Sequence, residues 1–579
     1  MLNKNRKQSV ILMACLCTWG ISQSSLAGDN RTPNRDTQNL IDTIVQTEAG
    51  PTNVAKPNMP AKAGKGVVAG YSQLLILFSD WRAFERPVFK NAVPDYSPQA
   101  RAAACPQFKK LEARLLAMDT SSWSVAEKVD WKIVRAEMNG YAFNQRVLQP
   151  WVRDPAFYLS IYNEASDTPA REGPTHHATI ELWQYRFPLS SADQSKLTQQ
   201  IRTIRPLLQQ AKQNLIGNAK DLWIAGTATM QQQVEELHAL ETKVETLASA
   251  ELKQAIREAS DASKDFVAWL EREGKHKSGP SGIGKENYTW YQQNVHLVPM
   301  TWQQEVDLLQ RELDRAWTNL KLEEQRNKDL PPMSAAASAE EFNQRADKAA
   351  SKLMRFLKDK EVMPIKANME PAIREHLQAF VPEEKRNFFS ITLHYDPVAL
   401  YCHWYHWFDL AQMRDEPHSS PIRRAPLLYN LWDTRNEGVA TGVEEMFMQM
   451  GLHDDSPRSR ELVWILLAQR AARGLGSLYA HANMKSMEEA SKVHLDWTPR
   501  NWMRREPHLL KFEQHLYLRQ PGYGTSYVVG KYLIEKLMTQ KAKQSELQHQ
   551  QFVMRDFFRD FNEFGNIPVS LTSEQMLAK

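Results

Sequence analysis

Two neighbouring stretches, LYCHWYHWFDLAQMR at residues 400–414 and RNEGVATGVEEMF at residues 435–447, decide how the rest of the chain is interpreted. The first carries two histidines and an aspartate within a dense aromatic run. The second places Glu437 and Glu444 seven residues apart, so two helical turns put both carboxylates on one face. We therefore expect two consecutive helices that bring histidines and carboxylates together, an arrangement suited to a metal site.

The composition favours a large helical protein. The 579 residues exceed the length of one ordinary domain, and 42% hydrophobic with 24% charged residues is globular composition. Glycine is scarce, at 23 residues, and runs of Val, Ile and Thr that would form strands are hard to find. From about residue 380 Trp, Tyr, His and Arg become dense, which favours the lining of a central cleft over an aromatic core. The prediction is a mostly α multi-helix fold.

The N-terminus has the pattern of an export signal. Lys4, Arg6 and Lys7 precede a mostly apolar stretch at residues 9–21, and small residues end at Ala27. Residues 1–27 are predicted to be a signal peptide, which places the mature protein in the bacterial periplasm. The LMAC sequence at residues 12–15 offers lipoprotein anchoring as the less favoured alternative, because only about six residues separate it from the basic cluster.

The net charge and the cysteine content limit which binding partners and which disulfides the chain can have. Removing residues 1–27 takes away three basic and no acidic residues, so the formal charge falls from +4 to +1. We therefore expect no nucleic-acid partner. No later window has the ~18 apolar residues of a membrane span. Cys105 and Cys402 are the two cysteines left, and both a disulfide and two free thiols stay open. Nothing in the sequence signals an oligomeric state.

The chain divides into four predicted parts. Residues 28–66 are polar and rich in Pro, Gly and Asn, typical of a flexible lead-in. Residues 67–284 form an N-terminal helical region, interrupted at 149–190 by a proline- and aromatic-rich irregular connection. Residues 285–579 form a C-terminal helical region that carries the cleft.

Three helix starts are marked by local sequence. Ser124 precedes an amphipathic pattern, and Thr301 and Ser338 each stand three residues before Gln or Glu, as in a capping box. We expect a helix to begin directly after each of these residues.

Five blocks of the C-terminal region carry a family resemblance. They are KENY with TWQQEV between residues 285 and 306, EGVATGVE at 437–444, RAAR with a later His and SMEEA between 470 and 490, PGYGTSYVVG at 521–530, and GNIPV at 565–569. In this order they resemble the domain of unknown function 885 family, whose helical members are similar to gluzincin zinc peptidases. The resemblance covers residues 285–571 and implies a helical fold with a peptidase-like cleft.

The resemblance also implies where a metal site would lie. The family pattern is H-E-x-x-P-G-H-H-L-Q, followed by a later glutamate that binds zinc. On this chain His403 takes the place of the first histidine, Trp404 that of the general base, Asp409 that of the second histidine, and Glu437 that of the third ligand. An indole cannot accept a proton from water, and losing a general base typically costs ~10²–10⁴ in rate. The implied site is degenerate, and its oxygen-rich donors suit Mn²⁺ or Ca²⁺ better than Zn²⁺.

Helical geometry offers a second metal set. Without Pro-Gly, residues 402–413 are predicted to form an unbroken helix, in which His403 and Asp409 point apart while His403 and His406 share a face. His403, His406 and Glu437 are therefore an alternative set of ligands for Zn²⁺ or another divalent metal.

Three further residues are candidates for catalysis through the resemblance. Tyr527 would face the cleft and contact a peptide main chain or an oxyanion, His481 would contact substrate or a ligand, and Glu444 would accompany Glu437. Plainer roles are a core position for the histidine and ion pairs between Glu437 or Glu444 and an arginine such as Arg423, Arg424, Arg470 or Arg473.

Two functions from different classes follow. The first is an exported binding protein for peptides or small polar ligands that keeps the cleft without standard zinc hydrolysis. The alternative is an active exported metallohydrolase or peptidase rebuilt around His403, His406 and Glu437. Whether the chain is an enzyme therefore depends on whether these side chains meet.

Overall fold

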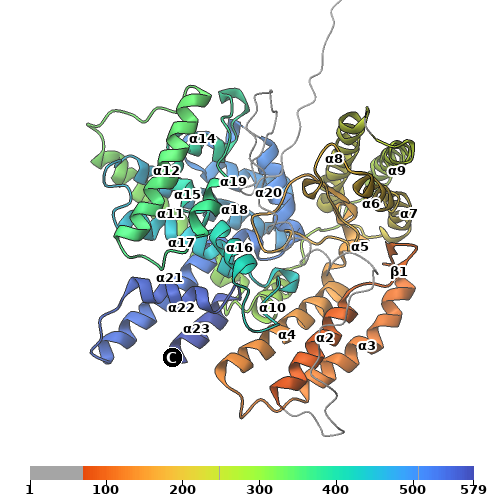
Figure 1. Cartoon of the computed structure of the whole chain (residues 1–579), viewed down its shortest axis with the longest axis horizontal. Coiled ribbons are helices and arrows are strands. Elements are labelled where there is room, and N and C mark those ends of the chain that lie inside the picture. Colours follow the sequence, from red (N-terminus) through yellow and green to blue (C-terminus); the bar gives the residue numbers. More distant parts are fainter. Residues whose placement is uncertain (1–69, 247, 506, 579) are drawn as a thin grey trace, which may run out of the picture.

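The computed structural model describes residues 70–246, 248–505 and 507–578, and within them the chain is almost entirely helical (Figure 1). The mostly α prediction is confirmed. The predicted signal peptide 1–27 and lead-in 28–66 lie outside the described residues. Within the described residues the strands form two short ladders: β1 (Phe89–Lys90) pairs antiparallel with β2 (Val93–Pro94), and β3 (Ile161–Tyr162) pairs parallel with β4 (Ile180–Glu181).

The first helices form a layer against the C-terminal body. They are α2 (Tyr71–Glu85), α3 (Pro98–Leu116) and α4 (Val125–Phe143). The predicted start at Ser124 is confirmed, because Ser124 and Glu127 form a complete capping box. Asp130 on α4 accepts a hydrogen bond of 2.5 Å from the buried guanidinium of Arg423, which joins this layer to the later part of the chain.

A second group of helices has its own apolar core. It comprises α5 (Pro150–Arg153), α6 (Ser191–Ile201), α7 (Ile204–Asn214), α8 (Lys220–Val244) and α9 (Ala250–Gly274). Leu197, Leu207, Leu237 and Phe266 meet there, all fully buried. In Figure 1 helices α6 to α9 are olive, and Leu222 of α8 shares a small apolar cluster with Ala480 and Leu518 of the C-terminal body.

The remaining helices build the C-terminal body. They are α10 (Lys285–Asn294), α11 (Trp302–Arg326), α12 (Ala339–Asp359), α13 (Met369–Arg374), α14 (Phe388–Tyr395), α15 (Pro397–Tyr401), α16 (Tyr405–Asp415), α17 (Asp433–Gln449), α18 (Ser459–His481), α19 (Met487–Trp497), α20 (Pro507–Arg519), α21 (Tyr523–Leu547), α22 (Met554–Glu563) and α23 (Val569–Ala578). The largest apolar core runs from Leu74 to Met576, so helices from both sides of residue 284 share it. The division at that residue stays a prediction.

The two other predicted helix starts differ in detail. Thr301 and Gln304 form a complete capping box at the start of α11. Ser338 caps α12 by accepting from the backbone N–H of Glu341, but the Glu341 carboxylate accepts from the N–H of Ala337 and so leaves the box half formed. Both helices nevertheless begin at the predicted residue.

The prediction of an unbroken helix over residues 402–413 is wrong. Helix α15 ends at Tyr401, and α16 begins only at Tyr405. Between them His403 N–H donates to Leu400 and Trp404 N–H to Tyr401, which are the three-residue bonds of tight turns. The rings of Tyr401 and Trp404 stack with centroids 3.9 Å apart across this turn. The chain therefore changes direction at the histidines.

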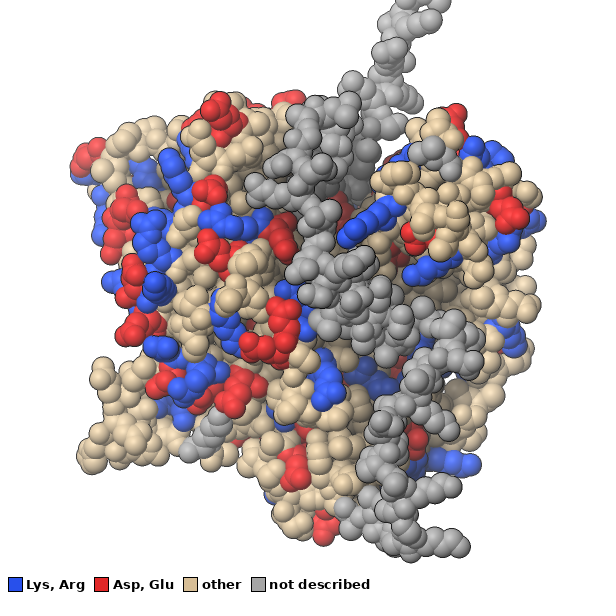
Figure 2. All heavy atoms as spheres, in the orientation of Figure 1, with Lys and Arg blue, Asp and Glu red and all other residues tan. Residues whose placement is uncertain are grey.

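The surface of the described chain mixes both charges. On the face drawn in Figure 2 lysines and arginines are interspersed with aspartates and glutamates. The cysteines are free: Cys105 is exposed on α3, whereas Cys402 is buried in the turn before α16. Among the described residues no helix combines the length and apolar character that crossing a membrane requires.

Helices α17 and α21 cross at a pair of glycines. A Cβ atom on Gly438 would lie 2.5 Å from Gly530 Cα, and one on Gly530 would overlap the carbonyl oxygen of Thr434. Only glycine permits this backbone approach. Because α17 carries Glu437 and Glu444, the crossing sets where these carboxylates lie.

The close crossing predicts that substituting alanine at two glycines will change the stability by very different amounts. Gly530→Ala should lower the free energy of unfolding by about 2–3 kcal/mol, because overpacking forces two backbones apart. Gly442→Ala on α17 is the matched control, since its Cβ would make ordinary contacts of 3.7 Å and 3.8 Å and helix propensity favours alanine. Denaturant midpoints measure both. Equal midpoints for the two variants would contradict the close crossing.

A buried carboxyl on α11 predicts a pH-dependent stability. Burial, opposed by hydrogen bonds from Thr525 and Tyr288, raises the pKa of Glu305 from 4.5 to about 7. The folded state therefore favours the neutral acid, so its stabilising contribution is complete below pH ~4.5 and is lost as the pH rises to ~7. The loss is up to about 3 kcal/mol at 1.36 kcal/mol per pKa unit. In Glu305→Gln, denaturant unfolding at pH 5 and pH 8 should show that much less pH dependence than the wild type; an unchanged dependence refutes the assignment.

Candidate metal centre

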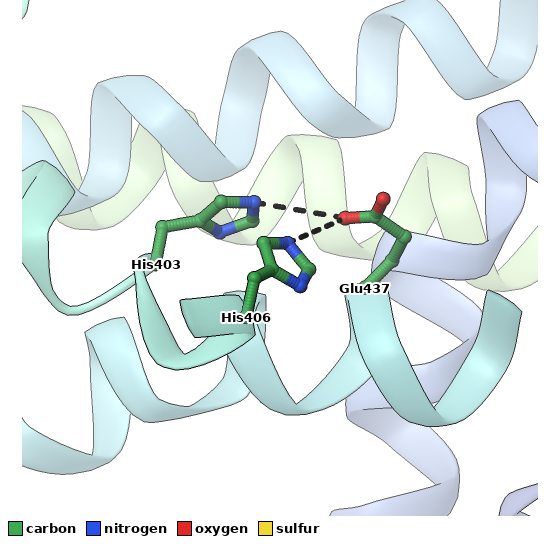
Figure 3. Close-up of side chains that lie close together, drawn as sticks. All are labelled: His403, His406 and Glu437. Atoms are coloured by element: carbon green, nitrogen blue, oxygen red, sulfur yellow. Dashed lines mark ion pairs between the residues drawn. The ribbon is translucent and has the colours of Figure 1, made fainter. Parts of the chain in front are cut away.

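Three buried side chains converge on one point. His403 lies in the turn before α16, His406 in the first turn of α16, and Glu437 on α17, and Figure 3 shows both imidazoles pointing at the carboxylate. His403 Nε2 lies 3.6 Å and His406 Nε2 3.3 Å from Glu437 Oε2. One ligand atom from each residue lies within 4.8 Å of the other two. The structure thus brings together the second of the two metal sets considered from sequence.

The spacing of these atoms fits a metal ion. Bonds of ~2.0–2.2 Å in a tetrahedral zinc site place neighbouring ligand atoms about 3.3–3.6 Å apart. Glu437 Oε2 is buried and accepts no well-aligned hydrogen bond, although it faces two imidazole nitrogens. A positive charge between them, carried by a metal ion or by a protonated imidazole, would neutralise this oxygen. Two imidazoles and one carboxylate suit Zn²⁺ and neighbouring transition metals, and leave a fourth position free.

His403 is oriented from behind by a carboxylate. Its Nδ1 lies 3.1 Å from Glu444 Oε1 and 3.0 Å from Arg470 Nη2. A guanidinium only donates, so the bond from Arg470 requires an unprotonated Nδ1; a proton on Nδ1 would instead bond to Glu444 and leave Nε2 free to bind a metal. This is the carboxylate–histidine–metal arrangement. Arg470 in turn holds Glu444 through bonds of 2.6 Å and 2.7 Å.

A proton and a metal ion would compete for the position between the two imidazoles and the Glu437 carboxylate. Burial lowers the pKa of His406, but the charges of Glu437 and Asp167 outweigh it and raise the pKa to about 9. Burial likewise opposes ionisation of Glu437, yet His406 and His403 hold its pKa well below the usual range. In the metal-free protein the cluster is therefore a buried imidazolium–carboxylate pair. Metal binding would release that proton.

Tyrosines of α21 cover the other side of the cluster. Tyr523 Oη donates to Glu437 Oε1 at 2.6 Å, and Tyr527 Oη donates to Tyr523 Oη at 3.3 Å. The Tyr527 ring lies parallel to the His403 ring with centroids 6.0 Å apart, and the Arg473 guanidinium lies 4.0 Å from the Tyr527 centroid. Tyr527 and Glu444 thus lie beside the cluster.

An irregular segment, the strap (residues 163–174), adds carboxylates that sequence reasoning missed. Gly173 N–H donates to Gln520 Oε1 at 2.5 Å, and Arg519 Nη2 donates to the adjoining Pro174 carbonyl at 2.8 Å. Asp167 and Glu172 of the strap lie in the electrostatic field of Glu437, and burial raises the pKa of both. No spacing rule identifies these two acids, because an irregular loop has no period.

Two predicted site residues lie elsewhere. Asp409 forms a bidentate ion pair with Arg435, at 2.8 Å and 3.0 Å. It cannot take the second ligand position while paired there, because α16 carries it away from the turn that holds His403. His481, the last residue of α18, bonds through Nε2 to the Tyr517 carbonyl at 2.8 Å and packs against Tyr288. Neither residue belongs to the three-residue cluster.

Comparisons with known proteins inform the fold. No protein-family model and no curated protein matches the chain. The chain is similar in structure to a "putative lipoprotein of unknown function" from Shewanella oneidensis, with a TM-score of 0.63 and 15% identity over 87% of this chain and 98% of that one. A "putative lipoprotein" from Colwellia psychrerythraea has a TM-score of 0.56 and 11% identity over 88% and 97%. At these identities the likeness shows a shared fold.

The place of Asp409 predicts a stability effect without a metal effect. Asp409→Asn should cost about 3 kcal/mol, because it leaves the Arg435 guanidinium buried with its charge uncompensated. Asp415→Asn, at the exposed end of the same helix, should cost under about 1 kcal/mol. Urea unfolding measures both, and metal analysis should find the same content in each. Loss of metal from Asp409→Asn alone would place Asp409 among the ligands.

Proposed function

We propose that this chain is an exported metallohydrolase with one divalent transition-metal ion held by His403, His406 and Glu437. The observation that carries the proposal is the buried Glu437 Oε2 that faces two imidazole Nε2 atoms at 3.3 Å and 3.6 Å. Structural zinc sites are closed by four protein ligands, whereas catalytic sites have three and keep one position open. The three-residue cluster is of the second kind.

Each residue around the centre has a chemical role in this proposal. When bound, the metal would polarise a substrate carbonyl and lower the pKa of water. With a metal bound, Glu444 would accept a hydrogen bond from the proton-bearing Nδ1 of His403 and so hold the metal-binding tautomer. Asp167 and Glu172, whose pKa values burial raises, would be the carboxylates that take up a proton beside the cluster. They would replace the glutamate whose family position Trp404 occupies. Tyr527 would donate towards a substrate oxygen.

Burial limits the substrate. His403, His406 and Glu437 are each only 1–2% exposed, and Glu172 of the strap lies 3.5 Å from the Tyr523 hydroxyl that bonds to Glu437. A surface hollow of about 590 Å³ is lined instead by the loop at residues 330–334 and by residues 456–459. The substrate class we propose is therefore a short peptide or another small polar amide, admitted when the strap moves. The signal-like residues 1–27 and the lipoprotein descriptions of the structural neighbours support export to the periplasm, free or lipid-anchored.

The second candidate is a ligand-binding protein without hydrolysis, as the sequence first favoured. Its specific support is Trp404, which stacks on Tyr401 at 3.9 Å and leaves no base beside the first histidine. The two candidates differ in turnover, not in metal content.

Metal content and turnover test the proposal. The mature chain 28–579, loaded with Zn²⁺, Mn²⁺ or Co²⁺ and desalted, should retain about one equivalent by mass spectrometry of the metal. His406→Ala and Glu437→Ala should each lose it, because two ligands hold an ion weakly. His481→Asn, a buried histidine outside the cluster, should retain it. A library of di- and tripeptides should be hydrolysed, and Glu437→Ala should lower the rate at least ~10²-fold.

Each possible result of these measurements distinguishes between the candidate functions. A wild-type protein that retains none of the three metals and hydrolyses no peptide overturns the metallohydrolase. A stoichiometric metal with no turnover across the library favours the binding protein. Turnover that persists undiminished in His406→Ala would place the chemistry elsewhere.

A further inference from the structure

The two oxygens of the Glu437 carboxylate have different surroundings. Oε2 faces His403 and His406, whereas Oε1 accepts a 2.6 Å hydrogen bond from Tyr523 Oη. We infer that Tyr523 is a positioning residue of the metal centre, whose hydroxyl holds the carboxylate so that Oε2 alone points at the two imidazoles. The inference rests on the metal site proposed above, and it assigns Tyr523 a role that no sequence block indicated.

The backbone places Tyr523 for this role. Gly522 precedes α21 in the left-handed conformation, with φ +87°, and a Cβ there would clash with the Gln292 amide. This turn starts α21 with Tyr523 fully buried. Its ring packs between those of Tyr517 and Tyr527, with centroids 6.0 Å and 5.7 Å away. A phenol held on both sides has little freedom to leave the carboxylate.

Hydrogen-bond direction supports the same role. Tyr527 Oη donates to Tyr523 Oη, so the single proton of Tyr523 is available for an acceptor. Two carboxylates compete for it: Glu437 Oε1 at 2.6 Å and Glu172 Oε1 of the strap at 3.5 Å. The shorter contact is the stronger bond, because charge-assisted O–H···O⁻ bonds have lengths of ~2.5–2.7 Å. Tyr523 therefore donates to Glu437.

The same two helices supply both the ligand and its holder. Glu437 lies next to Gly438, where α17 touches Gly530 of α21, and Tyr523 begins α21. The glutamate side chain still has rotatable bonds beyond this rigid contact. Anchoring Oε1 restricts them and favours binding of the ion through Oε2 alone, which keeps the fourth position free. Loss of such an outer hydrogen bond typically weakens metal affinity 10–100-fold.

Tyr523→Phe tests the inference, because it removes the hydroxyl and keeps the ring. Competition with a chromogenic chelator should give a Zn²⁺ dissociation constant about 10–100-fold higher than that of the wild type. The visible absorption of the Co²⁺-loaded variant should weaken and shift, because a free carboxylate adds its second oxygen to the ion. Tyr401→Phe is the matched control: Tyr401 is equally buried, and its hydroxyl has no hydrogen-bond partner among the described residues. Its affinity and spectrum should equal those of the wild type.

A double-mutant cycle separates positioning from a general effect on folding. In the metal-free protein, Glu437→Gln and Tyr523→Phe together should shift the denaturant midpoint by a different amount from the sum of the two single shifts, because the two side chains share one hydrogen bond. Full additivity would mean that Tyr523 acts without Glu437 and would overturn the inference.

The failures are distinguishable. If the wild type binds no metal, the proposed function falls and takes this role with it. If the wild type binds metal while Tyr523→Phe keeps both its affinity and its Co²⁺ spectrum, only the positioning role falls. Should Tyr523→Phe not fold, Tyr527→Phe carries the test. Losing the donor to Tyr523 should weaken Zn²⁺ binding several-fold, and an unchanged affinity would overturn the role.

Discussion

A carboxylate at the centre of a large helical core needs a positive charge beside it. Glu437 is 1% exposed, and isolated charges at such depth cost many kcal/mol. The two imidazoles supply that charge, through a proton on His406 or through a metal ion that both bind. Much of the surrounding polar structure follows from this need, since Tyr523 bonds to Glu437, Glu444 faces His403, and Arg470 holds Glu444 in place.

The backbone around the site also places these side chains. The glycine contact between α17 and α21 brings the helix of Glu437 against the helix of Tyr523, and the sharp turn at residues 402–404 presents His403 and His406 together. The strap brings two further acids into the electrostatic field of Glu437. Because the cluster is buried, electrostatic interactions within it are stronger than at a surface.

Sequence reasoning reached the helical fold and the position of the site, because helix period, capping residues and the spacing of Glu437 and Glu444 are local properties. It also singled out His403 and His406 as a pair, but for an incomplete reason. The pair meets at a turn between two helices, not on one face of a continuous helix. The aromatic stack of Tyr401 and Trp404, which lies at that turn, has no signature in residue types alone.

The sequence by itself determined that the chain is helical and that its histidines and carboxylates gather near residues 400–447. Only the tertiary structure decided which of those residues meet. Asp409 forms an ion pair with Arg435, and His481 hydrogen-bonds to a backbone carbonyl. Asp167, Glu172 and Tyr523 lie near the site although they come from segments far away in the chain. Side-chain partners depend on distances across the fold, and local periodicity contains no information about those distances.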